Sequence, residues 1–311
     1  MSTLQLDALP ADEIDRIVDK LSYHETDFDE AVAHQQLSTK TPPPPLLHGT
    51  SKPSTCGIGT LARLPPEVIS YVCLMLDVQS LLTLSQVNRH ARNVVATNPQ
   101  LRRLADHASN CLWVTMKTGL ARHITTRSLY HALMTRKCSF CRYFGSFIIL
   151  PTAQRCCFLC IKNRHDLQPL YLKTICKLSG LSAKRIQASS IPIMRSIPGT
   201  YSLEQKSIPK RRLVVGAQHA RQILLDVGRP LPDKWPDTYL LRFTMATFLP
   251  WYDSKSGELH RGLACLGCRH AVDDNIFIDG YHERRDRAYT RQEFLSHIST
   301  CQDAYELLAD P

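Results

Sequence analysis

The cysteines of this chain constrain its fold more than any other feature. Four of the twelve form two Cys-x-x-Cys pairs separated by fifteen residues: Cys138, Cys141, Cys157 and Cys160. A Cys-x-x-Cys turn places two thiolates side by side, and each can reach a zinc ion at about 2.3 Å. Two such turns complete a tetrahedral site, so the spacing predicts a zinc-ribbon-like module. Cys156 is an alternative to Cys157, which keeps the two-residue spacing.

A second set near the C-terminus combines cysteine with histidine. It consists of Cys265, Cys268, His297 and Cys301. Gly267 suits a sharp turn inside the first pair. Residues 291–298 read as a helix, and positions 297 and 301 would share one helical face. The set predicts a second zinc site, with His270 and His282 as alternative ligands.

Both sets offer four protein ligands. A catalytic zinc ion usually has three and keeps one position open for water, so we expect two structural ions. The sequence shows no nucleophile motif, no phosphate-binding glycine loop and no His-Glu-x-x-His pair. We interpret the adjacent acids Asp273 and Asp274 as solvated loop residues. A non-catalytic protein is therefore predicted.

Cysteine pairs that bind metal are typical of a reducing compartment. The acidic stretch over residues 1–13 lacks the basic and apolar regions of a secretory signal. No stretch reaches the ~18 apolar residues of a membrane span. We therefore expect a cytoplasmic or nuclear protein with no membrane partner.

Charge is distributed unevenly along the chain. The first 50 residues hold nine acids and three bases, whereas the other 261 carry a net charge of +16. Basic clusters occur at Lys206, at 210–212 and at 284–287. Such an excess suits nucleic acid or an acidic partner. Because the clusters lack interleaved aromatic residues, a zinc-containing nucleic-acid-binding protein is the alternative function and nucleic acid the less favoured partner.

Residues 61–104 carry the clearest helical pattern. The stretch 64–67, Leu-Pro-Pro-Glu, resembles a helix start. Apolar residues then follow at helical spacing: Val68, Ile69, Val72, Cys73 and Leu76. Asp77 is a suitable N-cap for a second helix, and a third begins near Asn88 and ends before Pro99. Three short helices bury little surface, so this unit is expected to need a partner or the following domain.

This segment resembles the F-box. The resemblance rests on a leading Leu-Pro, three helices and a trailing leucine: residues 64–69, Leu76, Asp77, Leu81, residues 84–89 and Leu101. It implies docking on the Skp adaptor of a cullin–RING ubiquitin ligase, with the cullin scaffold as a further partner. The rest of the chain would present an unknown protein substrate, and other subunits would carry out the ubiquitin chemistry.

The apolar excess on so small a unit indicates which side chains face the adaptor. The expected contacts are Leu64, Pro65, Ile69, Leu81 and Leu84. A longer resemblance, over roughly residues 60–305, is to a group of filamentous-fungal F-box proteins. It rests on residues 196–201, residues 211–215 with Ala220, residues 265–268 and residues 289–301.

Together these features predict a mainly α protein, with an N-terminal three-helix F-box followed by small α+β zinc-stabilised modules. Residues 1–55 are expected to be a disordered, acidic and Pro-rich segment, although the spacing of Ile14, Ile17, Val18 and Leu21 allows a short amphipathic helix. The expected units that follow are the F-box (56–105), a helical segment with the four-cysteine module (106–175), a mixed α/β connecting region (176–260) and the Cys3His module (261–311). A strand at 213–215 and a helix at 217–227 are expected in the connecting region.

Overall fold

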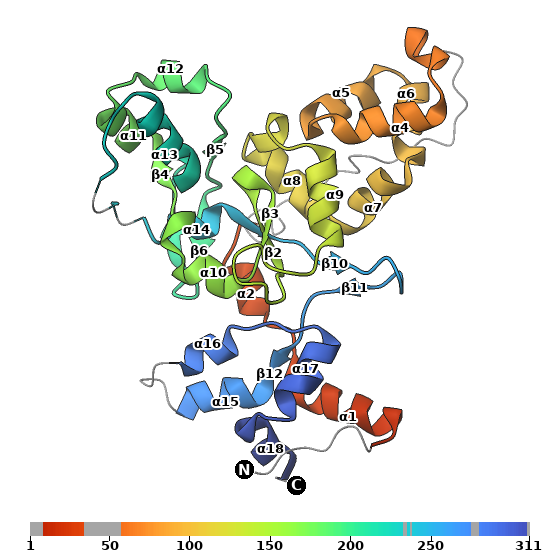
Figure 1. Ribbon diagram of the computed structural model, residues 1–311, viewed down its shortest axis with the longest axis vertical. Coiled ribbons are helices and arrows are strands. Elements are labelled where there is room, and N and C mark those ends of the chain that lie inside the picture. Colours follow the sequence, from red (N-terminus) through yellow and green to blue (C-terminus); the bar gives the residue numbers. More distant parts are fainter. Residues whose placement is uncertain (1–8, 34–56, 233–234, 237, 275–279, 310–311) are drawn as a thin grey trace.

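The computed structural model describes residues 9–33, 57–232, 235–236, 238–274 and 280–309. Within these ranges the chain is mainly helical and forms five small sheets of two or three strands. Figure 1 shows a helical arm (residues 59–134), a mixed lobe (170–226) and a C-terminal module (264–309). This agrees with the expected mainly α class with α+β parts.

The helical arm consists of two 3-10 turns and six α-helices: η2 (Gly59–Arg63), α4 (Pro66–Met75), α5 (Val78–Val87), α6 (Arg89–Thr97), α7 (Pro99–His107), α8 (Ser109–Lys117), η3 (Leu120–Arg122) and α9 (Thr126–Met134). Side-chain caps mark the junctions. Asp77 and Asn88 each accept a hydrogen bond at 2.8 Å from the backbone N–H three residues further on. Such caps satisfy donors that a helix start leaves unpaired, so these residues fix where α5 and α6 begin.

The first helices of the arm pack against a later helix of the same arm, α9. The hydroxyl of Thr126 donates to the carbonyls of Cys73 and Leu74 at 3.0 Å, and its backbone N–H donates to the carbonyl of Leu76 at 3.0 Å. Cys73 itself is buried. The short helices over 66–97 therefore complete their packing on α9, as their small size requires.

A three-stranded antiparallel sheet joins the arm to the remainder. It contains β2 (Phe147–Ile149), β3 (Gln154–Cys156) and β9 (Ala246–Phe248), in the order β3-β2-β9. Helices α10 (Phe158–Asn163) and α14 (Leu241–Thr244) pack beside it. The four-cysteine module thus shares its sheet with a strand from the expected connecting region, so the boundary expected at residue 176 does not separate two folding units.

The mixed lobe is built on β4 (Leu170–Tyr171), β8 (Leu213–Val215) and β5 (Ile193–Arg195), with β8 in the middle. Its helices are α11 (Leu172–Ser179), α12 (Ala183–Gln187) and α13 (Ala217–Asp226). Leu170, Ile175 and Ile223 belong to a core cluster of its own. The strand and the helix expected at 213–215 and 217–227 are β8 and α13. A hairpin of β6 (Gly199–Tyr201) and β7 (Lys206–Ile208) follows β5.

The C-terminal module contains β12 (Ala264–Cys265), α15 (Leu266–Asp274), α16 (Tyr281–Arg285), α17 (Arg291–Ile298) and α18 (Gln302–Ala309). A hairpin of β10 (Trp251–Tyr252) and β11 (Leu259–His260) leads into it. Gly267 lies where α15 meets α18. A Cβ atom at this position would lie 2.4 Å from the backbone nitrogen of Ala304, so only glycine permits the contact.

The N-terminal segment differs from its expected disorder. Residues 9–33 are folded, and the amphipathic helix allowed by the spacing is α1 (Ala11–Leu21). Val18 and Leu21 are buried against the C-terminal module, and β1 (Ser22–Tyr23) pairs with β12. Composition predicted disorder because the segment cannot bury its apolar face alone. The partner that covers this face lies near the other end of the chain.

A second N-terminal helix, α2 (Thr26–Glu30), inserts into the main core. The ring of Phe28 stacks on Phe158, with 3.9 Å between the ring centroids. Residues 1–8 and 34–56, which include the proline run, lie outside the described residues.

Candidate functional site

The first candidate metal centre is a cluster of four thiols. Its members are the predicted residues Cys138, Cys141, Cys157 and Cys160, whose Sγ atoms lie within 4.8 Å of one another. The Sγ atoms of Cys141 and Cys157 are 3.5 Å apart. Sulfur atoms at the corners of a tetrahedron around zinc would be about 3.8 Å apart, given Zn–S bonds near 2.3 Å. The thiols therefore fit a metal ion that prefers tetrahedral sulfur ligands.

Backbone hydrogen bonds orient two of these thiols within the cluster. The backbone N–H groups of Phe140 and Cys160 donate to the sulfur atoms of Cys138 and Cys157, each at 3.4 Å. Cys157 also caps the start of α10, where the helix dipole favours a thiolate. Within the cluster, hydrogen bonds from neighbouring thiols lower the pKa of Cys138, which favours the deprotonated form that a metal requires, whereas they and burial raise the pKa of Cys157.

Only one of the two adjacent cysteines belongs to the cluster. Cys157 belongs to it and Cys156 does not. Cys156 is fully buried at the end of β3, and its thiol donates to the carbonyl of Cys157 at 3.3 Å. Strand β2, which lies between the two cysteine pairs, starts at Phe147.

A buried arginine holds the surroundings of this cluster together. The Nε of Arg155 donates to the carbonyl of Gly145 at 2.6 Å, and its Nη1 donates to the carbonyls of Ala132 and Pro250 at 3.0 Å. Only 2% of the residue is exposed. Burial lowers the pKa of Arg155 to about 9, which leaves the guanidinium charged at neutral pH. Arg155 thus joins α9, the sheet and the strand leading to β10.

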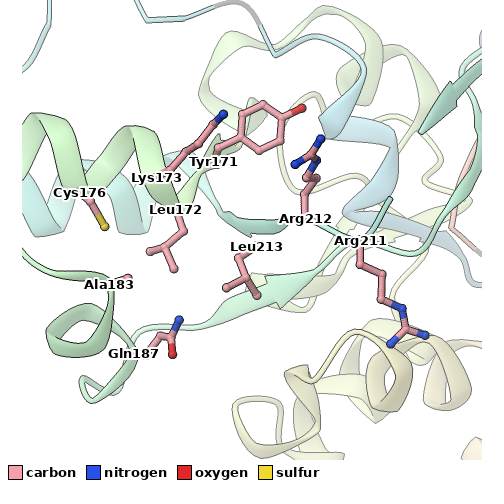
Figure 2. Close-up of a pocket in the computed structure, with 9 residues that line it drawn as sticks. All are labelled: Tyr171, Leu172, Lys173, Cys176, Ala183, Gln187, Arg211, Arg212 and Leu213. Carbon is pink, nitrogen blue, oxygen red and sulfur yellow. The ribbon is translucent and has the colours of Figure 1, made fainter. Parts of the chain in front are cut away.

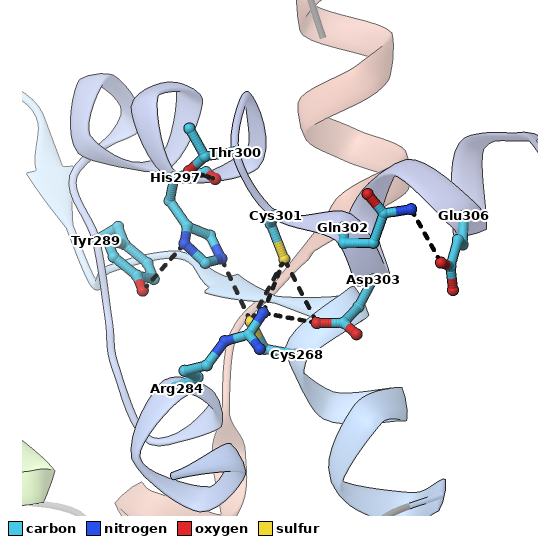
Figure 3. A network of polar contacts seen from close by, with 9 residues as sticks. All are labelled: Cys268, Arg284, Tyr289, His297, Thr300, Cys301, Gln302, Asp303 and Glu306. Atoms are coloured by element: carbon cyan, nitrogen blue, oxygen red, sulfur yellow. Dashed lines mark hydrogen bonds and ion pairs between the residues drawn. The ribbon is translucent and has the colours of Figure 1, made fainter. Parts of the chain in front are cut away.

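The second candidate metal centre lies in the C-terminal module (Figure 3). Its members are Cys265, Cys268, His297 and Cys301, again with ligand atoms within 4.8 Å of one another. The Sγ of Cys268 is 3.4 Å from Nε2 of His297 and 3.7 Å from Sγ of Cys301. These separations also fit one tetrahedral ion.

A tyrosine and an arginine surround this second cluster. The ring of Tyr289 stacks on the imidazole of His297 at 4.7 Å, and its hydroxyl lies 3.4 Å from Nδ1. That contact leaves Nε2 to face the thiols. Arg284 donates to Sγ of Cys301 at 3.5 Å and to Asp303 at 2.6 Å, so a positive charge lies against the cysteines (Figure 3).

One detail of the predicted site is wrong. Helix α17 ends at Ile298, so His297 and Cys301 do not share one helical face. Cys301 lies at the junction between α17 and α18, after a turn in which the N–H of Thr300 donates to the carbonyl of His297 at 3.1 Å. The alternative ligands His270 and His282 do not belong to the cluster.

The helical arm carries an exposed apolar face, here called the α4 face. It contains large apolar side chains between 38% and 57% exposed: Leu61, Leu64, Val68, Tyr71, Val72 and Met75. Their spacings of three and four along η2 and α4 place them on one side of the helix. A folded chain rarely leaves such a stripe in water unless a partner covers it.

The predicted adaptor contacts agree with the α4 face only in part. Leu64 and Pro65 are exposed, and Ile69 and Leu84 are half-buried. Leu81 is only 1% exposed and belongs to the core, so it does not face a partner in this structure. The prediction for Leu81 was wrong because α5 directs this side chain toward the neighbouring helices.

Sequence reasoning missed Tyr71 and Met75, and it grouped Val68 and Val72 on one helical face with Cys73, which is buried. Helix α4 is apolar on most of its circumference, so helical periodicity alone does not distinguish its inner side from its outer side. Tyr71 gave the available signal, because it continues the spacing of Leu64 and Val68.

Comparison with known proteins identifies one domain, and this domain includes the α4 face. Residues 61–103 match the family model of the F-box domain. The chain therefore carries an F-box domain, which supports its classification as an F-box protein. F-box domains generally mediate binding to the Skp adaptor of cullin–RING ligases. No curated protein and no solved structure matches this chain.

The matched segment contains α4, α5, α6 and the first part of α7. It is not N-terminal as expected, because α1 and α2 precede it and pack against other parts of the molecule. Among the described residues, no helix has the length and apolar character that crossing a membrane requires.

Proposed function

We propose that this protein is a non-catalytic substrate receptor that docks on the Skp adaptor of a cullin–RING ubiquitin ligase. The α4 face is the observation that carries the proposal. Six large apolar side chains lie exposed on one side of η2 and α4, and all six fall within the matched F-box. Burial of such a face in a partner's groove is a common mode of helix recognition.

We further propose that the two Cys/His clusters hold structural zinc ions. Each cluster supplies four protein ligands, which fill a tetrahedral site and leave no position for water or substrate. Such an ion would supply folding free energy to a small module. The chain's own residues favour its binding, since the pKa values of Cys138 and Cys301 are lowered, and the N–H of Phe140 and the guanidinium of Arg284 donate to their sulfur atoms.

The α4 face gives a direct test of adaptor docking. Val68→Glu together with Tyr71→Glu places two charges where the proposed interface excludes water. Co-purification of the Skp adaptor should be lost while zinc content stays unchanged. Leu225→Glu is the matched control, because Leu225 is 59% exposed, Tyr71 is 57% exposed, and Leu225 lies on the mixed lobe. Undiminished adaptor binding by the double variant would overturn the proposal.

The dependence of binding on salt concentration distinguishes adaptor docking from nucleic-acid binding. Affinity for RNA should fall steeply between about 50 and 200 mM salt, because phosphate contacts release counterions. Adaptor binding through the α4 face should change little over the same range, since apolar burial dominates it. A chain that binds RNA tightly and retains no adaptor would favour the alternative function.

A further inference from the structure

Two pockets among the described residues differ in the character of their linings. The pocket of the mixed lobe, shown in Figure 2, has a volume of about 630 Å³, and the ring of Tyr171 lies between the head groups of Lys173 and Arg212. Within the part of the chain that the structure describes, no buried polar atom of this lining lacks a hydrogen-bond partner. A second pocket of about 420 Å³, here called the α9 pocket, is lined by α9 with its two flanking residues, by Ser139 and by residues 152–155.

The α9 pocket is polar over most of its lining. Five of its lining residues carry a hydroxyl group, and the only apolar ones among the described residues are Ala132 and Ala153. Pockets that accept drug-like ligands are instead lined mainly by hydrophobic and aromatic side chains. An apolar ligand would therefore gain little here, whereas a ligand rich in polar groups can form hydrogen bonds with most of the lining.

The helix side of the α9 pocket offers hydrogen-bond acceptors. The hydroxyl of Ser128 donates to the carbonyl of Thr125 at 2.7 Å, and that of Thr135 donates to the carbonyl of His131 at 2.7 Å. A hydroxyl group has a single hydrogen, so these two oxygens have only lone pairs left for a ligand. A ligand must therefore donate hydrogen bonds on this side, and hydroxyl groups can do so without adding charge.

The segment 152–155 contains polar atoms that no other described group satisfies. Three of them are buried and have no hydrogen-bond partner among the described residues: Oγ1 of Thr152, Oε1 of Gln154 and Nη2 of Arg155. Such atoms are rare in folded proteins, and a bound molecule is one way to satisfy them. Thr152 and Gln154 are only half-buried, so rotation of their side chains is sufficient to present these oxygens to the α9 pocket.

The backbone of the same segment is strained. Ala153 has a φ of 52°, in the left-handed region that residues with a Cβ atom seldom adopt. It follows η4 (Leu150–Thr152) and directs the chain into β3. Strained conformations persist where the surrounding structure holds them, and they cluster at ligand sites. Here the strain lies in the lining of the α9 pocket, between the unpaired atoms of Thr152 and Gln154.

The charge of the α9 pocket favours an anion. Arg127, His131 and Arg155 line it, and no acidic residue does so among the described residues. In the same part of the chain, none of the three has a carboxylate within ion-pair distance. Arg127 is exposed, and a guanidinium can bind a carboxylate through two parallel hydrogen bonds. A neutral ligand would leave these charges without a partner.

We propose that the α9 pocket binds a small carboxylic acid that carries several hydroxyl groups, as sugar acids do. The carboxylate accepts hydrogen bonds from Arg127, and the hydroxyl groups donate to Ser128, Thr135 and Gln154. The volume of about 420 Å³ lies within the range of small-molecule sites. This proposal does not depend on adaptor docking, because the α9 pocket and the α4 face are formed by different side chains.

The test is isothermal titration calorimetry of the full chain with three classes of probe. The sugar acids glucuronate, galacturonate and mannuronate carry both features. Their neutral parents glucose, galactose and mannose carry the hydroxyl groups alone, and cyclohexanecarboxylate carries the carboxylate alone. At least one sugar acid should bind at least about tenfold more tightly than its neutral parent and than cyclohexanecarboxylate. Equal affinities in these comparisons, or no binding of any sugar acid, would show that the proposal is wrong.

Two variants locate the binding. Gln154→Glu keeps the shape of the side chain but adds a negative charge, and Arg127→Met removes a positive one, so each should weaken binding of the acid at least about tenfold. Gln218→Glu makes the first change at an exposed position on α13 and should leave the affinity unaltered. Melting temperatures without ligand show which variants are folded, and the exposed Arg127 keeps the test decisive if Gln154→Glu unfolds. Affinity that persists in the folded pocket variants, or tighter binding of glucose 6-phosphate than of glucuronate, would contradict the assignment.

Discussion

At the residue scale, single polar side chains hold together segments that are distant in sequence. Arg155 is the clearest case, since its guanidinium donates to carbonyls of three separate segments from inside the core. Nothing in the local sequence around Arg155 indicates burial, because arginine is mostly an exposed residue. The spacing of the neighbouring cysteines predicted their cluster from the sequence. The role of this arginine could not be predicted in that way, because it depends on how strands and helices pack in three dimensions.

Replacing Arg155 by methionine tests that role. Methionine keeps the apolar stem of the side chain, but the carbonyls of Gly145, Ala132 and Pro250 lose their donor in a place that water does not reach. We expect the free energy of unfolding to fall by roughly 2–4 kcal/mol. Urea denaturation followed by circular dichroism measures it. Arg122→Met, at an exposed position, should change it by less than about 0.5 kcal/mol, and equal losses in both variants would contradict the assigned role.

At the scale of elements, the two Cys/His clusters show how much the spacing of residues in the sequence can predict. The intervals between cysteine and histidine residues predicted the eight members of the two clusters before any geometry was known, because a Cys-x-x-Cys turn brings two thiols together locally. The caps Asp77 and Asn88 likewise marked the starts of α5 and α6. Spacing did not reveal β9 as the third strand beside β2, since Phe147 and Phe248 pair across about a hundred residues.

The adjacent cysteines offer a matched test of metal binding. Cys141→Ser should remove one of the two proposed zinc ions and open residues 138–160 to protease, because three ligands hold the ion poorly. Cys156→Ser makes the same chemical change at a buried cysteine outside the cluster and should keep both ions. Elemental analysis and limited proteolysis of each purified variant provide the measurement. Two ions in Cys141→Ser, or one in Cys156→Ser, would refute the assignment.

At the scale of the whole molecule, the segment near the N-terminus completes the module near the C-terminus. Val18 and Leu21 share a core cluster with Phe294 and Ile298, and Arg291 forms an ion pair with Asp15. An acidic residue of the first 50 therefore lies beside a basic residue of the rest of the chain, which carries the net positive charge. Composition described these two surpluses separately, and only the fold shows that they partly neutralise each other.

This contact predicts an effect at a distance. Val18→Asp places a charge in the core shared by α1 and the C-terminal module, and we expect faster amide hydrogen exchange over residues 264–304, with a local loss of more than about 2 kcal/mol. Arg16→Asp introduces the same residue on the exposed side of the helix and should leave exchange unchanged. Adaptor binding should persist in both variants. Protection that stays intact in Val18→Asp would show that the module folds without α1.

The pairing of β1 with β12 has a consequence for how the protein is made. Ser22 pairs with Cys265, so a ribosome must add 240 residues between the two strands. At roughly 5–20 residues per second, the early strand and its helix wait about 12–50 seconds for their partner. Throughout that interval the apolar side of α1 is open to water and to chaperones. Helix α1 leaves the ribosome before the other helices that the structure describes, and it is thus among the last of them to reach its final place.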